Sequence, residues 1–157
     1  MISDYIIIPS DKSGSSQLEL LVADPTEGFH LLSVDAAGDA RHLTDLQEFN
    51  QDADADCESL GKIERFSLSA NKKLMAIYSN SDQGTLIVLK SDLTQELNRL
   101  TTGMAGAENL IWCGNDVTVT EYIDKVIMVG PAGECLTLDL GMPKTQGIKC
   151  YTEIDGL

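Results

Sequence analysis

The chain has 157 residues, of which 43% are hydrophobic and 23% are charged. This composition is typical of a globular protein that is large enough for one domain with its own core. Its 25 acidic and 11 basic residues give a formal net charge of −14. Such a field repels nucleic acid and anionic lipid surfaces, so we do not expect nucleic acid as a partner. The basic residues are scattered, and Lys72-Lys73 is the only basic doublet.

The four cysteines are Cys57, Cys113, Cys135 and Cys150, and no two of them form a Cys-x-x-Cys pair. Zinc sites usually draw their ligands in close pairs, so we expect no metal and no cofactor. The sequence shows no secretory signal and no Asn-x-Ser/Thr sequon. Reduced thiols in a cytosolic protein are therefore favoured over two disulfides. No apolar run approaches the ~20 residues that a membrane-spanning helix needs.

In chain order, short runs rich in Ile, Val, Leu and Tyr alternate with clusters of Gly, Pro, Asn, Asp and Ser. This pattern predicts strands joined by tight turns. The candidate strands are residues 4–8, 18–23, 30–34, 63–67, 74–79, 85–89, 109–112, 117–122, 125–129 and 135–139. Short strands at this density predict an all-β sandwich, barrel or propeller.

A repeat favours the propeller. The segments "HLLSVDAAGDARHL", "LIVLKSDLTQELNRL" and "VIMVGPAGECLTLDL" each contain an apolar strand, a small polar turn and a second strand. With Val34, Leu89 and Val129 taken as equivalent, the spacings are 55 and 40 residues. About 40 residues is the length of a four-stranded blade. We predict a partial β-propeller of about three to four WD-like four-stranded blades, whose inner strands are buried on both faces.

The predicted blade units cover about residues 4–45, 60–102 and 106–140, and another unit starts at 147–157. The longer first spacing matches an acidic segment, residues 44–58, which we interpret as an insertion between blades. The chain is expected to begin within one blade and to stop as another starts. Its open blade edges are expected to favour self-association.

The stretch "IWCGNDV" invites two interpretations, a reactive cysteine or a corner between two strands. A reactive Cys113 needs a nearby cation or a helix N-terminus, but Gly114, Asn115 and Asp116 follow it. The two histidines, His30 and His42, lie in a different repeat. The sequence therefore favours a corner in which Trp112 and Cys113 are buried as a packing pair before the turn.

The acidic segment resembles a calcium-binding loop only in part. Asp52, Asp54 and Asp56 fall at its first, third and fifth positions, but Cys57 stands where glycine is needed and Ile63 where the last ligand belongs. A solvated acidic segment is favoured over a calcium site. Asp52, Asp54, Asp56 and Glu58 are candidates for docking a basic partner surface.

Catalytic signatures are missing from the sequence. It contains no P-loop, no Gly-x-Ser-x-Gly elbow and no Gly-x-Gly-x-x-Gly motif, and no nucleophile is paired with a histidine. The segment 129–133, "VGPAG", is interpreted as a hairpin in which Pro131 presets φ and Gly133 takes the strained angle. We expect a protein that is not an enzyme and has no catalytic residues.

The third repeat, followed by "TEIDGL", resembles the N-terminal propeller of the vacuolar protein sorting-associated protein 16 family. The resemblance covers about residues 60–157, whereas residues 1–59 match only in propeller style. It rests on a Trp-Cys-Gly-Asn-Asp box, an acidic turn, a Gly-Pro-x-Gly turn and a late Glu-Ile-Asp-Gly. These motifs are Trp112, Cys113, Gly114, Asn115 and Asp116; Asp124; Gly130, Pro131 and Gly133; and Glu153, Ile154, Asp155 and Gly156.

The resemblance implies a non-enzymatic scaffold within a class C core subunit shared by the HOPS and CORVET tethering complexes. It further implies protein partners from such a complex, and a cytoplasmic location on endosome and vacuole or lysosome membranes. Family members also carry an α-solenoid, which this sequence does not contain. Two alternatives remain open: a generic WD-like interaction scaffold unrelated to tethering, and a β-rich enzyme with a site at the propeller centre.

Overall fold

The computed structural model describes residues 4–24, 28–34, 40–45 and 62–141, and within them all regular secondary structure is β-strand. Twelve strands form three four-stranded antiparallel sheets, each built from consecutive strands paired in chain order. The strands are β1 (Asp4–Ile8), β2 (Leu18–Asp24), β3 (Gly28–Val34), β4 (Ala40–Asp45), β5 (Lys62–Leu68), β6 (Leu74–Asn80), β7 (Thr85–Lys90), β8 (Glu96–Thr101), β9 (Asn109–Cys113), β10 (Val117–Glu121), β11 (Lys125–Val129) and β12 (Cys135–Asp139). The all-β prediction is confirmed.

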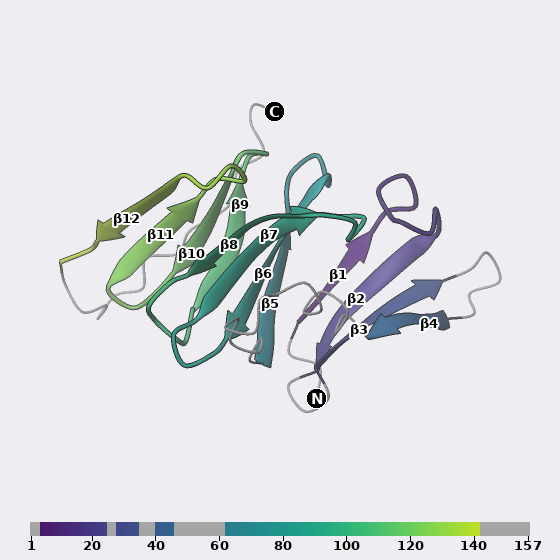
Figure 1. The fold of residues 1–157 in the computed structure, drawn as a ribbon, viewed down its shortest axis with the longest axis horizontal. Helices are drawn as coiled ribbons and strands as arrows, with labels where there is room; N and C mark the ends of the chain where they lie inside the picture. The colour runs from purple at the N-terminus through teal and green to yellow at the C-terminus, as the bar shows by residue number, and fades with distance from the viewer. Residues whose placement is uncertain (1–3, 25–27, 35–39, 46–61, 142–157) are drawn as a thin grey trace.

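The three sheets stand side by side in chain order, with the first at one end of the molecule and the third at the other (Figure 1). Their first strands lie together, because β5 contacts both β1 and β9. Each sheet therefore starts near a common line and extends outward from it. This is the arrangement of successive propeller blades.

All ten strands expected from the sequence are present, with ends that shift by at most two residues. The outer strands β4 and β8 were not among the ten, although both lie inside the repeated segments. Their sequences, ARHLTD and ELNRLT, are mostly polar. An outermost strand has one unpaired edge and less to bury, so its apolar signal is weak.

Two apolar cores lie on opposite faces of the second sheet. The core toward the first sheet contains Ile8, Leu21 and Phe66, and the core toward the third contains Leu110 and Trp112. Side chains of β6 alternate between them, as the strand period requires. Met75 and Ile77 belong to the first core, and Ala76 and Tyr78 belong to the second.

The strands buried on both faces are the middle ones, which corrects the expectation for the innermost strands. In β6 every residue from Met75 to Ser79 is buried, whereas the innermost strand β5 buries only Ile63 and Phe66 fully. A middle strand has a hydrogen-bonded neighbour on each side and a packed sheet above and below. The innermost strand lacks one of those neighbours.

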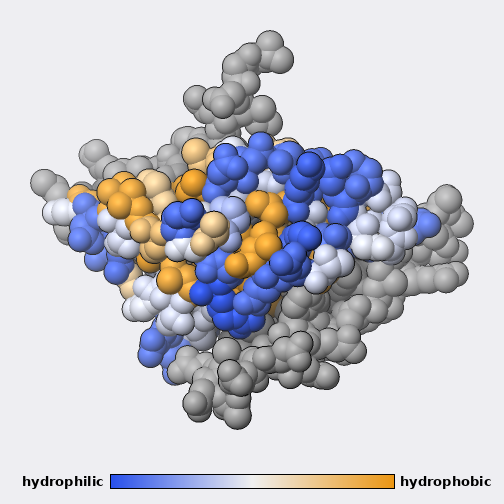
Figure 2. Space-filling view, turned by 45° about the horizontal axis from the view of Figure 1, so that its top comes forward, coloured by the Kyte–Doolittle hydropathy of each residue, from blue (hydrophilic) through white to orange (hydrophobic). Residues whose placement is uncertain are grey.

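The two outer faces of this three-sheet stack carry exposed apolar side chains. Tyr5 and Ile7 on β1 are 61% and 50% exposed, and Leu136 and Leu138 on β12 are 55% and 42% exposed. Hydrophobic residues reach the surface on the side of the third sheet (Figure 2). In a propeller, such faces are the surfaces on which neighbouring blades pack.

Candidate functional site

The corner between β9 and β10 is formed by residues 112–116 and connects the third sheet to the second. Trp112 is 1% exposed and lies in the core between these sheets with Leu110. Cys113, the next residue, is exposed. The prediction of a buried Trp-Cys pair was therefore wrong for the cysteine, because adjacent residues of a strand point to opposite faces.

Three hydrogen bonds tie this corner to the second sheet. The indole N–H of Trp112 donates to the carbonyl of Ser67 at 2.9 Å. The amide of Ala70 donates to the carbonyl of Gly114 at 3.1 Å, and the amide of Asn71 donates to Oδ1 of Asn115 at 2.7 Å. All three bonds reach residues 67–71, at the end of β5 and in the β5–β6 turn. The corner at 112–116 therefore fastens two blades together, and we call it the inter-blade clasp.

The turn between β11 and β12 makes a second connection to the same sheet. The amide of Gly133 donates to the carbonyl of Gly130 at 3.2 Å, and Gly133 has a φ of 100°. This is the tight hairpin turn expected from the sequence. Nδ2 of Asn98 on β8 donates to the carbonyl of Gly130 at 3.2 Å. The Gly-Pro-x-Gly motif thus contacts the outer strand of the second sheet.

Asp116 and Glu134 border an apolar groove between these two turns, on the face of the third sheet that points away from the second. The groove has a volume of about 500 Å³, and its walls include Val117, Met128 and Leu136. It is an apolar slot with two carboxylates at its edge. Neither carboxylate has a cation beside it among the contacts that the structure describes.

The segment that joins β8 to β9, residues 102–108, contains contacts that sequence reasoning missed. The hydroxyl of Tyr122 donates to Oγ1 of Thr102 at 2.8 Å, and Oγ1 of Thr102 donates to the carbonyl of Met104 at 2.9 Å. The hydroxyl of Tyr78 donates to the same carbonyl at 3.1 Å. The two tyrosine rings meet edge to face, with centroids 6.3 Å apart.

Gly84 lies against this tyrosine network with a φ of 65°. A Cβ at this position would lie 2.0 Å from the carbonyl oxygen of Met104 and 2.7 Å from the hydroxyl of Tyr78. A side chain therefore cannot fit without moving the connecting segment. The sequence showed only a turn, "SDQG", and its one signal for this contact was the glycine at the end of that turn.

Both buried tyrosines keep their protons more firmly than an exposed phenol does. Burial raises the pKa of Tyr78 and raises that of Tyr122 further, since loss of water disfavours the phenolate. The hydrogen bond that Tyr122 donates to Thr102 opposes this shift only in part. These phenols are structural donors at neutral pH.

The described residues offer no metal site: among them, no three His, Cys, Asp or Glu side chains lie close enough together to bind one ion. In the same part of the chain, no helix is long and apolar enough to cross a membrane. The other predicted site residues lie outside the described ranges and stay predictions. They are Asp52, Asp54, Asp56 and Glu58 of the acidic segment, and Asp155 and Gly156.

Comparison with solved structures defines the class of fold. The chain is similar to a crystal structure of RRP9 WD40 repeats and to a structure of U3-55K, each with a TM-score of 0.62 and 14% identity. Each match covers 88% of this chain but only 38% and 39% of those chains, so the chain spans less than two fifths of their length. The molecule is a set of WD40-like β-propeller blades, as predicted.

The family follows from the sequence as a whole. Residues 19–157 match the family described as Vps16, N-terminal region. The match includes both turn motifs that contact the second sheet, and it covers most of the chain. The chain therefore belongs to the Vps16 N-terminal region family. No curated protein sequence is significantly similar to it.

Proposed function

We propose that the chain is a non-enzymatic scaffold propeller of a class C core tethering subunit of the HOPS and CORVET kind. In this role it supports vesicle tethering and SNARE-mediated fusion at endosomes and at the lysosome or vacuole. The observation that carries the proposal is the family match over residues 19–157. The protein would be cytoplasmic and would reach those membranes through other subunits of the complex.

The geometry supports a rigid platform for such a role. Adjacent blades share cores on both faces of the second sheet. The third sheet is fixed to the second by the hydrogen bond that Trp112 donates to Ser67 and by the one that Asn115 accepts from the Asn71 amide. A platform of this kind binds partners by surface complementarity and needs no chemistry of its own. The partners would be protein subunits of the tether.

The acidic segment at 44–58 is the proposed docking element for a basic surface of such a subunit. Replacing Asp52, Asp54 and Asp56 with Asn removes three charges and keeps the side-chain shapes. We expect this variant to recover less of the partner. The matched control replaces the exposed Asp82, Asp124 and Asp139 with Asn. Equal recovery by the first variant and the wild-type chain would contradict a docking role.

The tethering proposal is tested by capturing the tagged protein from its own cells and identifying co-purifying proteins by mass spectrometry. Recovery of the other tether-core subunits would support it. Recovery of a different, reproducible assembly would overturn it. Such a result would favour the second candidate function, a generic WD-like interaction scaffold. That candidate is supported by the match to WD40 structures at 14% identity, because such a fold alone specifies no particular partner.

A further inference from the structure

One end of the first two blades gathers most of the lysines that the structure describes. Six lysines lie in the described ranges, and four of them, Lys12, Lys72, Lys73 and Lys90, belong to the β1–β2 loop, the β5–β6 turn and the end of β7. In sequence they are up to 78 residues apart. The fold therefore assembles a basic patch that the scattered sequence positions did not reveal.

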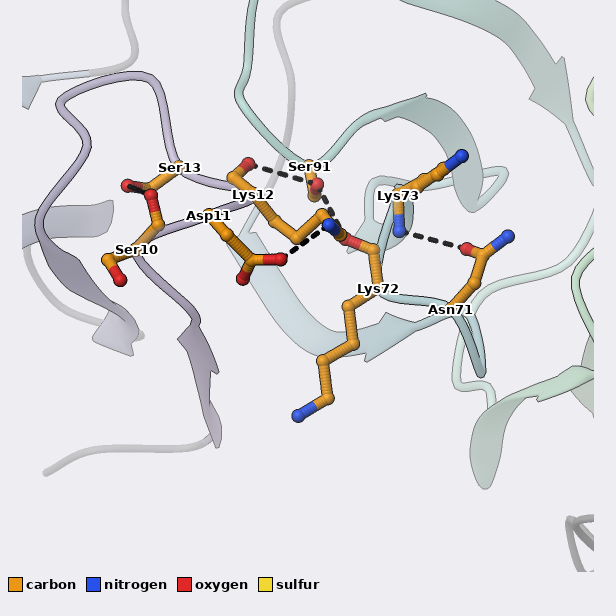
Figure 3. A network of polar contacts seen from close by, with 8 residues as sticks. All are labelled: Ser10, Asp11, Lys12, Ser13, Asn71, Lys72, Lys73 and Ser91. Atoms are coloured by element: carbon orange, nitrogen blue, oxygen red, sulfur yellow. Dashed lines mark hydrogen bonds and ion pairs between the residues drawn. The ribbon is translucent and has the colours of Figure 1, made fainter.

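The loops that carry this patch are fixed to one another through Ser91, which is buried. Its hydroxyl donates to the carbonyl of Lys72 at 2.7 Å and lies 3.3 Å from the carbonyl of Lys12 (Figure 3). Its amide donates to the carbonyl of Lys73 at 3.0 Å. Three of the lysines are thus presented from backbone that is held in place, and binding them costs little additional loop ordering.

Most of the positive charge in the patch is available to a partner. Lys12 pairs with Asp11, and this hydrogen bond lowers the pKa of the Asp11 carboxyl, with a smaller contribution from the charge of Lys72. Within the described residues, no carboxylate lies within ion-pair distance of Lys72, Lys73 or Lys90. The nearby Asp92 carboxylate instead accepts hydrogen bonds from Thr94 within its own turn.

The opposite end of the blades carries Lys62 and Lys125, at the starts of β5 and β11, together with several exposed carboxylates. Its β6–β7 turn, its β8–β9 connection and its β10–β11 turn carry the exposed residues Asp82, Glu108 and Asp124. In a chain with a net charge of −14, four of the six described lysines therefore lie at one end. An anionic partner that approaches this end meets local attraction from the lysines, against the net negative charge of the chain as a whole.

The directions of the side chains indicate what kind of anion fits. Lys72 and Lys73 are adjacent, but their ammonium groups point away from each other (Figure 3). In this arrangement they do not converge on a single phosphate or headgroup. Carboxylates spaced along an extended chain can meet them one after another. A broad anionic membrane would also face the repulsion of the whole acidic molecule.

We propose that the lysines at this end form a docking surface for an acidic, extended segment of a partner protein. The proposal uses residues other than those of the acidic segment at 44–58, and it does not depend on the tethering role. Its partner carries the opposite charge to the basic partner expected for that segment. The strength of binding should fall as salt is added, since exposed charge pairs are screened.

The test compares two variants with the same change in net charge. The first is Lys72→Glu with Lys73→Glu, and the control is Lys62→Glu with Lys125→Glu, at the opposite end of the blades. The probe is a fluorescein-labelled peptide of alternating glutamate and serine, followed by fluorescence anisotropy. We expect binding about tenfold weaker for the first variant and within about twofold of wild type for the control.

Each other outcome overturns the proposal. Equal weakening in both variants would mean that only total charge matters, and no binding of the peptide by the wild-type chain would mean that the surface does not dock acidic segments. Phosphatidylserine vesicles provide a second arm. Vesicle binding that depends on Lys72 and Lys73, without peptide binding, would identify an anionic membrane as the partner instead. If charge reversal disturbs folding, judged by circular dichroism, Lys72→Gln with Lys73→Gln replaces it, with a smaller loss of about threefold.

Discussion

The indole nitrogen of Trp112 on β9 donates a hydrogen bond to the carbonyl oxygen of Ser67 on β5, 2.9 Å away. This bond joins the innermost strands of two adjacent blades, with Trp112 buried in the core between them and Ser67 half-buried at its edge. A tryptophan here supplies both a large apolar surface and a single donor at its edge. The relationship explains why this position needs more than a bulky apolar residue.

Trp112→Phe should therefore destabilise the protein by about 1–3 kcal/mol. The substitution removes the donor, leaves the Ser67 carbonyl without that partner and reduces the volume of the core. The measurement is the free energy of unfolding from urea denaturation. Cys113→Ser is the matched control, because Cys113 is the next residue and is exposed. It should change stability by less than about 0.5 kcal/mol, and similar losses in both variants would contradict the clasp.

Gly84→Ala should destabilise the protein by about 3 kcal/mol or more. Its φ of 65° disfavours any side chain, and the new Cβ would collide with the Met104 carbonyl at 2.0 Å. Gly103 separates the two effects, since its φ is 72° and a Cβ added there would have no atom within 4 Å. Gly103→Ala should destabilise the protein by only about 1 kcal/mol, because a side chain disfavours the positive φ and meets no other atom. Thermal and urea unfolding of both variants measures the difference. An equal loss in the free energy of unfolding would show that the close contact with the Met104 carbonyl does not affect stability.

Asn115→Ala should loosen the clasp at the β5–β6 turn. It removes the acceptor of the 2.7 Å hydrogen bond from the Asn71 amide, and we expect a loss of about 0.5–1 kcal/mol. The direct measurement is hydrogen exchange at the Asn71 amide, which should become faster. Asn115→Asp keeps an oxygen acceptor and should retain most of the protection. Unchanged exchange in the alanine variant would show that the bond does not persist in solution.

Most of the fold could be predicted from the sequence, because its signals are local. A run such as residues 85–89 is apolar, β-rich and bounded by turn residues, and the repeat spacing then identifies a blade. The sequence signal for the outer strand β8 was weaker for a physical reason. Five of its six residues are half-buried and Thr101 is exposed, so its sequence shows little apolar periodicity.

The contacts between the second and third blades could be predicted only in part, because they join residues that are distant in sequence. Trp112 and Ser67 are 45 positions apart, and no local pattern indicates which carbonyl receives the indole proton. The turn at Gly133 was predictable, since proline and glycine set its backbone angles locally. The lysine patch was not, because it arises from loops of two blades that meet only in the folded chain.

The two buried tyrosines predict a loss of stability in alkali. Unfolded tyrosine releases its proton near pH 10.0, whereas the folded protein holds the protons of Tyr78 and Tyr122 to higher pH because burial raises both pKa values. Above about pH 10 the unfolded state binds fewer protons than the folded state, so the free energy of unfolding falls as pH rises. Below that pH the contribution is fully present.

Urea denaturation from pH 7 to pH 11 measures this fall, and Tyr122→Phe should make it shallower. The variant also loses the hydrogen bond to Thr102 and starts from a lower stability, so the slope with pH is compared and the starting value is not. Tyr5→Phe is the control, because Tyr5 is 61% exposed, and its slope should match that of the wild-type chain. A Tyr122→Phe slope as steep as that of wild type would mean that the phenol of Tyr122 reaches water in the folded protein, and the segment joining the second and third blades would then be less closely packed than the structure shows.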